Sequence, residues 1–231
     1  MSNYREIIYP EDKNNNYPMK LSRYLVERFI GDKDPEQCKI LDVGCSIGTW
    51  LNCFEKIGNY KLYGTDIRDE NIKNAIFKPC NLEVDNLPFD DNMFDFVFSK
   101  SVAEHVKNTD NFLREIKRVL KPGGVFVCMV PDWKSQMSIY WDDYTHVKPF
   151  TQKGLRDALM IHGYSEVGCE YFYQLPFIWK YPFLKFFPRL ISALVPDWFK
   201  WKDSDQRNTK DRKLIRFSKE LMLLAYGGKN D

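Results

Sequence analysis

The sequence predicts an α/β fold with a doubly wound, mostly parallel sheet of seven strands. Three observations support this prediction. Short apolar runs alternate with segments of helical apolar spacing over residues 38–130, a turn with two glycines joins the first apolar run to a helical segment, and two more apolar runs follow near the carboxyl end. Strands that alternate with helices of this length form βαβ units, because each helix returns the chain to the edge where the next parallel strand begins.

The elements are expected in the following order. Residues 1–20 are polar and rich in turn residues, which predicts an extended arm, and apolar positions 21, 25, 26, 29 and 30 have helical spacing. Strands are predicted at 39–43, 61–65, 76–80, 94–98 and 125–130, with helices at about 49–57, 69–73 and 109–120. Lys121-Pro-Gly-Gly124 is expected to stop the last of these helices, since Pro122 cannot continue it and the two glycines permit a turn.

The last part of the chain departs from this alternation. Thr151 can cap a helix that runs to about Ile161, and strands are predicted at 166–173 and 220–226, the second stopped by Gly227-Gly228. Between these strands lies an insertion at about 174–214 that is dense in Phe, Trp, Tyr and Pro. We therefore expect a single domain over residues 1–231, with an arm and helix at 1–37, a first half at 38–130 and a second half at 131–231.

Composition weighs against several classes of function. The 231 residues carry a formal charge of only +2, with basic and acidic side chains interspersed, so no nucleic-acid-binding footprint stands out. The six cysteines are scattered without a Cys-x-x-Cys pair, which leaves zinc and redox sites without support. Neither a signal peptide nor a transmembrane segment is expected, and a reducing, cytoplasmic location is predicted.

The turn within Lys39-Ile-Leu-Asp-Val-Gly-Cys-Ser-Ile-Gly-Thr-Trp50 carries the first chemical signal. Gly44 permits a positive φ or a close approach of the backbone to a ligand, and the segment after Gly48 is predicted to be a helix whose first N–H groups point back at the turn. Asp66 ends the next apolar run, where its carboxylate can accept hydrogen bonds from a ribose diol. Ser46 stands where a dinucleotide fingerprint has its second glycine, which disfavours a pyrophosphate-binding turn.

The pattern Asp42-x-Gly44-x-Ser46-x-Gly48 resembles motif I of the class I S-adenosylmethionine-dependent methyltransferases, which is usually written with three alternating glycines. Further similar motifs follow in order: Asn86-Leu-Pro-Phe89, Phe94-Asp-Phe-Val97, and Leu113, Glu115, Arg118 and Leu120 with Lys121-Pro-Gly-Gly124. The resemblance covers about residues 38–130. It implies a Rossmann-like sheet whose last strand is antiparallel, S-adenosylmethionine as the cofactor, a cofactor-binding half at 38–130 and an acceptor half at 131–231.

The same resemblance implies which residues contact the cofactor. The turn after the first strand faces the methionine moiety, Asp66 faces the ribose and Ile67 lies on one face of the adenine, while residues after the third and fourth strands complete the site. The cofactor-binding residues expected on this basis are Asp42, Gly44, Cys45, Ser46, Gly48, Asp66, Ile67, Asn81, Leu82, Ser99 and Lys100. Asn81 stands where an aspartate is common in the family, and its amide can still pair with an adenine edge.

Methyl transfer to a hydroxyl needs a base, because a protonated hydroxyl is a poor nucleophile. His105 follows the fourth strand and His146 lies in the loop after the fifth, so both are expected at the mouth of the cofactor cleft. Each is a candidate base, and each has a structural alternative: His105 can order a helix start and His146 can fasten its loop. Asp142 and Asp143 are candidate partners that orient a histidine, bind sugar hydroxyls or, with Glu104, hold a divalent cation. Solvated loop charges without a metal are the simpler interpretation of these carboxylates.

The aromatic insertion has three alternative roles. It can form a lid over the acceptor, bury itself in a homodimer interface, or lie on a membrane surface, and its prolines weaken the last role by breaking any long helix. The His146 loop and the insertion together resemble methyltransferases that accompany glycosyltransferases in glycan synthesis, which implies a sugar or glycan hydroxyl as the acceptor. Methylation of nitrogen or carbon on another small metabolite, or cofactor binding without turnover, are the alternatives.

Overall fold

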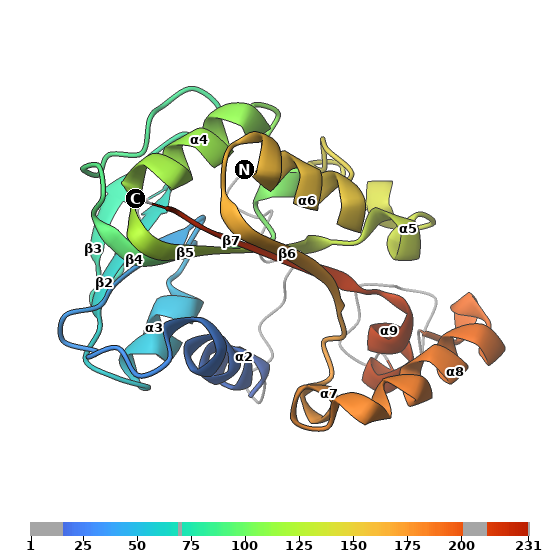
Figure 1. The fold of residues 1–231 in the computed structure, drawn as a ribbon. Helices are drawn as coiled ribbons and strands as arrows, with labels where there is room; N and C mark the ends of the chain where they lie inside the picture. The colour runs from blue at the N-terminus through green and yellow to red at the C-terminus, as the bar shows by residue number, and fades with distance from the viewer. Residues whose placement is uncertain (1–15, 69–70, 201–211, 231) are drawn as a thin grey trace.

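The computed structural model describes residues 16–68, 71–200 and 212–230, and Figure 1 shows their fold. A seven-stranded sheet runs through them in the order β3-β2-β1-β4-β5-β7-β6. Its strands are β1 (Lys39–Val43), β2 (Lys61–Asp66), β3 (Ile76–Pro79), β4 (Phe94–Lys100), β5 (Leu120–Pro131), β6 (Ser165–Phe172) and β7 (Met222–Gly228). Neighbouring strands are parallel except where β7 pairs with β5 and with β6. The predicted α/β fold, with a mostly parallel sheet and an antiparallel last strand, is confirmed.

Helices cover both faces of the sheet, with α2 and α3 on one face and α4 and α6 on the other (Figure 1). The helical segments are α2 (Tyr17–Leu25), η1 (Val26–Ile30), α3 (Thr49–Glu55), η2 (Ala103–His105), α4 (Thr109–Val119), α5 (Trp133–Gln136), η3 (Tyr140–Asp142), α6 (Gln152–Ile161), α7 (Pro176–Lys180), η4 (Pro182–Lys185), α8 (Phe186–Leu194), η5 (Asp197–Lys200) and α9 (Lys213–Lys219). The predicted cap of α6 is confirmed, since Thr151 Oγ1 accepts a hydrogen bond of 3.1 Å from Gly154 N.

The core lies in two layers, one on each side of the sheet. Leu41 and Val97 belong to the layer beneath α4 and α6, whereas Ile40, Phe96 and Phe98 belong to the layer against α2 and α3. Successive side chains of a strand point to opposite faces, so a strand that is covered on both sides must be apolar at nearly every position. This requirement explains the continuous apolar runs that predicted the central strands.

The predicted helix at 69–73 is wrong for the part of it that is described, because residues 71–73 are not helical. Only residues 67–75 connect β2 to β3, and Asn71 adopts a left-handed φ of 56°. A connection this short has no room for a helix together with the turns that must enter and leave it. Residues 71–75 instead lead to β3 without regular structure.

At several ends of helices and strands, proline and glycine lie at positions other than those predicted. Residues 17–20, expected to be part of an extended arm, open α2, and Pro18 lies in its first turn, where a missing N–H breaks no helical hydrogen bond. Gly123-Gly124 and Gly227-Gly228 lie inside β5 and β7 rather than beyond their ends. α4 ends at Val119, because Leu120 has already turned to extended backbone. The rest of the predicted arm, residues 1–15, lies outside the described residues.

The described part of the aromatic insertion is a series of short helices, α7, η4, α8 and η5. Pro176, Pro182 and Pro188 each stand in the first turn of one of these helices, so the described part of the insertion is divided into short helices, as predicted. The insertion leaves the sheet after Phe172 and returns at Met222, two residues that pair with each other. Residues 201–211 of the predicted insertion lie outside the described residues. Among the described helices, none combines the length and the apolar character needed to cross a bilayer.

Candidate active site

The carboxyl ends of four neighbouring strands gather the predicted cofactor-binding residues at one edge of the sheet. These residues are Asp42, Gly44, Cys45, Ser46 and Gly48 at the end of β1 and in the turn after it, Asp66 and Ile67 at the end of β2, Asn81 and Leu82 after β3, and Ser99 and Lys100 at the end of β4. Ligands of open α/β sheets collect at this edge, because the loops that leave the strands diverge there and open a crevice.

Hydrogen bonds order the turn that follows β1. Gly44 N and Cys45 N both donate to Thr65 O, at 2.8 and 3.1 Å. Asp66 then accepts from Ser46 N at 2.9 Å through one carboxylate oxygen and from Ile67 N at 2.7 Å through the other. A carboxylate has about four lone-pair positions, so Asp66 can order this turn and still accept hydrogen bonds from a ligand diol.

The turn leaves no room for a side chain at Gly44. The φ of Gly44 is +79°, and a Cβ atom there would lie 2.2 Å from Val102 Cγ2. Gly48 has a φ of +75° and begins α3 as its N-cap, while Ser46 holds a φ of 47° without being glycine. Backbone in these conformations exposes peptide groups to an incoming ligand. The segment after β4 is thus packed directly on the candidate cofactor turn.

Two of the predicted residues are buried beneath the turn. Ser99 Oγ donates to Val43 O at 3.1 Å. Burial, together with the nearby Asp66 carboxylate, raises the pKa of Asp42 to about 8, so its carboxyl is protonated at neutral pH. Asp42 Oδ2 is buried and finds no hydrogen-bond partner among the described residues. A buried polar atom without a partner at a ligand-binding edge fits a site that a ligand completes.

The other two strand ends contribute an amide and an ammonium group. Asn81 Oδ1 accepts from Glu83 N at 3.1 Å, so this oxygen shapes its own turn and the side-chain NH₂ is the group suited to an adenine edge. Lys100 is half-buried, and its Nζ lies 5.8 Å from the centre of the Trp50 ring. Burial lowers the pKa of Lys100, and the Glu104 carboxyl partly counteracts this effect.

His105 is oriented by a chain of hydrogen bonds from the loop after β5. Its Nδ1 lies 3.1 Å from Thr145 O and 2.9 Å from Thr145 Oγ1. Thr145 Oγ1 itself donates to Asp143 Oδ1 at 2.6 Å, so its proton is not shared with the imidazole. His105 Nδ1 therefore carries the proton and donates it, which leaves Nε2 with a lone pair.

His146 has the same tautomer for a different reason. Its Nδ1 lies 2.6 Å from Tyr140 O, a carbonyl that can only accept, so Nε2 again carries the lone pair. Tyr140 is buried and its hydroxyl donates to Lys148 O at 2.7 Å. The rings of His105 and His146 lie 4.9 Å apart. The structure therefore brings the two predicted histidines together, and both fasten the loop through Nδ1 while Nε2 keeps its basic lone pair.

Glu104 lies beside the two imidazoles. It is buried, neither carboxyl oxygen finds a hydrogen-bond partner among the residues described, and burial raises its pKa to about 8. One possible ligand atom from each of Glu104, His105 and His146 lies within 4.8 Å of the others. Two imidazole nitrogens and a carboxylate form a donor set that suits zinc and related divalent cations. Asp142 is exposed and does not belong to this group.

Several residues at this edge were not predicted from the sequence. Thr145 and Tyr140 orient the two histidines, and only their closeness to His146 in the sequence could have suggested this role. Tyr17, Trp50 and Trp179 meet beside the end of β4, with Tyr17 5.7 Å from Trp179 and 6.4 Å from Trp50 between ring centres. These three rings come from α2, α3 and α7, so no local pattern relates them.

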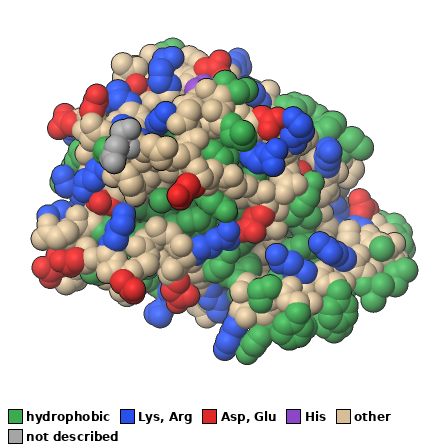
Figure 2. Space-filling view, viewed as in Figure 1, with side chains coloured by type: hydrophobic (Ala, Val, Ile, Leu, Met, Phe, Trp, Pro, Cys, Tyr) green, Lys and Arg blue, Asp and Glu red, His purple; other side chains and the backbone are tan. Residues whose placement is uncertain are grey.

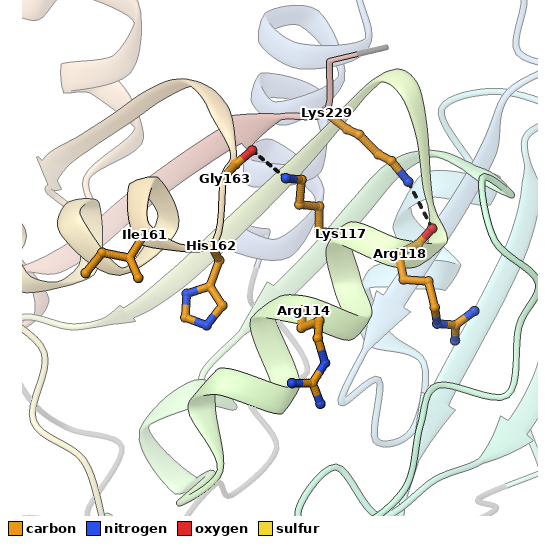
Figure 3. Close-up of a pocket in the computed structure, with 7 residues that line it drawn as sticks. All are labelled: Arg114, Lys117, Arg118, Ile161, His162, Gly163 and Lys229. Atoms are coloured by element: carbon orange, nitrogen blue, oxygen red, sulfur yellow. Dashed lines mark hydrogen bonds between the residues drawn. The ribbon is translucent and has the colours of Figure 1, made fainter.

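A separate hollow of about 510 Å³ lies at the opposite edge of the sheet, where α4 ends and β6 begins (Figure 3). Its lining residues are Arg114, Lys117, Arg118, Ile161, His162, Gly163 and Lys229. Lys117 Nζ donates to Gly163 O at 2.6 Å and Lys229 Nζ donates to Arg118 O at 3.1 Å. Arg118 also pairs with Glu115 at 2.7 Å and Asp91 at 2.6 Å. These cations hold α4 to its neighbours, which is a structural role.

Comparison with known proteins agrees with this geometry. Residues 41–128 match the family described as "Methyltransferase domain". An uncharacterized protein of Methanocaldococcus jannaschii is 30% identical over 190 residues, which span 80% of this chain and 76% of that protein. The ubiquinone biosynthesis O-methyltransferase of Maricaulis maris is 32% identical over 108 residues, and the match spans only 42% of its length and 42% of this chain.

A solved structure extends the comparison over the whole fold. A chain in the complex between the Haloferax volcanii Trm112 methyltransferase activator and a methyltransferase superposes with a TM-score of 0.67, at 20% sequence identity, and the match covers 93% of this chain and 91% of that one. At this identity the likeness concerns the fold alone. The superposition also covers the regions before residue 41 and after residue 128, and the family match does not reach these regions.

Proposed function

Because the chain belongs to the family of S-adenosylmethionine-dependent methyltransferases, we propose that it transfers the methyl group of this cofactor to a hydroxyl of a small acceptor. The observation that supports a hydroxyl acceptor is the pairing of His105 and His146. Each has a lone pair on Nε2, and each lies near the edge of the sheet that gathers the candidate cofactor-binding residues. A hydroxyl must lose its proton as it attacks, whereas an amine that arrives neutral needs no base.

The residues at the strand ends fit the proposed cofactor. The turn at Gly44–Ser46 would hold the methionine half, Asp66 the ribose hydroxyls and Ile67 one face of the adenine. The unpartnered Asp42 oxygen and the crowded backbone at Gly44 support this assignment, because both are features that a ligand-binding turn requires. When bound, S-adenosylmethionine supplies a methyl group activated by a sulfonium.

We assign the base to His105. The bound cofactor would supply the methyl group, and His105 Nε2 would take the proton that the acceptor hydroxyl loses on methylation. The resulting imidazolium is stabilised because Nδ1–H donates to Thr145, whose hydroxyl donates to the Asp143 carboxylate. His146 Nε2 also carries a lone pair, so His146 is the alternative acceptor of this single proton.

The acceptor class is the finer part of the proposal. The Maricaulis relative, by its name an O-methyltransferase of ubiquinone biosynthesis, supports a hydroxyl acceptor on a quinol-like ring. The resemblance to methyltransferases of glycan synthesis supports a sugar hydroxyl. Aromatic side chains such as Trp50 and Trp179 can stack on either kind of ring.

Incubation with methyl-labelled cofactor tests the proposed function. The acceptor panel contains phenols, quinols, free sugars and glycans, each with and without a chelator, and amines serve as the contrasting class. We expect label in an O-methyl ether and no loss of turnover with chelator. Label only in an amine, or in no pool despite cofactor binding, would contradict the proposal. Loss of O-methylation with chelator would instead assign Glu104, His105 and His146 to a catalytic cation.

Replacing Asp66 by alanine is expected to weaken binding of S-adenosylhomocysteine by about 10- to 100-fold, since hydrogen bonds to a charged group are worth about 1.5–3 kcal/mol. Calorimetric titration measures this loss. Asp90→Ala, which removes an exposed carboxylate away from the strand ends, is the control and should bind normally. Equal affinity of the Asp66 variant and the parent protein would show that another group holds the ribose.

A further inference from the structure

An exposed apolar face lies on the aromatic insertion. Side chains from η4 and α8 project from it with 48–73% of their surface exposed, and they are Phe183, Phe186, Phe187, Leu190 and Leu194. We call these five residues the α8 face. Figure 2 shows hydrophobic side chains gathered at the lower right, over α7 and α8, with lysine and arginine side chains beside them. Apolar patches of this kind mark binding surfaces, because leaving them in water costs free energy.

The α8 face belongs to a lobe that residues 174–200 and 212–220 form, and the rest of this lobe holds the face in place. Spacings of three and four residues put Phe187, Leu190 and Leu194 on one side of α8, and Phe183 precedes them in η4. The backbone of α8 is anchored to α9, since Lys219 Nζ donates to Ser192 O and to Val195 O, both at 2.9 Å. Lys219 also pairs with Asp197 at 3.0 Å. The apolar side chains are therefore presented outward by a packed helix pair.

The charge of the surrounding residues indicates which kind of partner the α8 face binds. Over residues 174–200 and 212–220 the chain has eight lysines and arginines but only two acidic residues, although its overall charge is only +2. Lys180 and Arg189 are exposed on the same segments as the apolar side chains. A symmetric dimer through this face would bring the two positive lobes together. Apolar side chains rimmed by cations are complementary instead to a bilayer that contains anionic lipid.

The lobe lies at the edge of the sheet that carries the candidate active site. It leaves the sheet at Phe172 and re-enters at Met222, which also pairs with Pro131 at the carboxyl end of β5. From the lobe, Trp179 reaches Tyr17, the neighbour of Trp50. A surface bound to the α8 face would therefore lie on the side of the molecule where the sheet carries the candidate active site.

We propose that the α8 face docks this protein on an anionic lipid bilayer. Phe183, Leu190 and Leu194 enter the boundary between headgroups and acyl chains, and the exposed Lys180, Arg189 and Lys213 attract the lipid headgroups. The binding is peripheral. It is independent of the acceptor and of methyl transfer, so docking and activity can fail separately.

Vesicle flotation tests the proposal with the full chain. Vesicles are made of phosphatidylcholine, with or without phosphatidylglycerol. We expect binding to the anionic vesicles that weakens as salt is raised. The variant Phe183→Ser/Leu190→Ser/Leu194→Ser should bind them at least about 100-fold more weakly, because three apolar side chains no longer leave water.

A matched control removes exposed apolar side chains elsewhere. Val84→Ser/Met160→Ser/Ile161→Ser changes residues that are 75%, 57% and 81% exposed on other elements, and it should float as the parent protein does. Circular dichroism should be the same for both triple variants. Unchanged flotation of the α8 variant overturns the proposal. So does sedimentation showing that the parent is a dimer which the α8 variant breaks, since a second copy would then cover the face.

Discussion

Replacing His105 by alanine is expected to lower kcat for O-methylation by about 100- to 10,000-fold, the usual contribution of a positioned general base. Affinity for the cofactor should not change, because His105 lies beyond the turn that holds it. Burial lowers the pKa of His105 and the neighbouring His146 adds to this effect, while Thr145 and Asp143 partly counteract it. A base works in its neutral form, so turnover should persist at neutral pH and fall only at pH values below the ordinary imidazole range.

Two further substitutions separate the base from its support. Thr145→Val removes the hydroxyl between His105 and Asp143 but keeps the side-chain shape, so we expect a partial loss of kcat and a shifted pH profile. His162→Ala is the control, because His162 ends α6 with its Nδ1 2.8 Å from Ala158 O. Normal kcat in the His105 variant with the productive acceptor would refute the assignment of the base.

Replacing Gly44 by alanine is expected to abolish measurable cofactor binding and to reduce the free energy of unfolding by about 2–5 kcal/mol. A left-handed backbone costs an alanine about 1–2 kcal/mol, and overpacking a filled site costs about 1–3 kcal/mol more. The overlap is specific, since the new Cβ would lie 2.2 Å from Val102 Cγ2. Chemical unfolding, with and without S-adenosylhomocysteine, measures both losses.

Two controls divide this cost into its parts. Gly123→Ala has a similar φ of +72° but its Cβ would meet no atom within 4 Å, so it should incur only the backbone cost and keep normal binding. The double variant Gly44→Ala/Val102→Ala removes the side chain that causes the overlap and should recover part of the stability. Equal stability of the Gly44 and Gly123 variants would show that the Val102 side chain moves away from the new Cβ with no loss in the free energy of unfolding.

The central sheet was predictable because its signals are local. β1, β4 and β5 each place apolar side chains in both core layers, a pattern that two-sided burial imposes on central strands. The predicted helix at 69–73 failed for a related reason. Whether a short segment between two strands becomes a helix depends on how far the chain must travel, and that distance is a property of the assembled sheet.

The features of the candidate site likewise fall into those set by local sequence and those set by tertiary contacts. Motif order and spacing predicted the fold and the family, and they pointed to the candidate cofactor turn at Gly44–Ser46 and to the carboxylate of Asp66, because each of these motifs lies within a few consecutive residues. Only the tertiary structure decided the tautomer of His105, its pairing with His146, the contact of Val102 with Gly44 and the outward apolar face of α8. These depend on contacts between segments far apart in the chain, and such contacts form only when packing against the sheet brings those segments together.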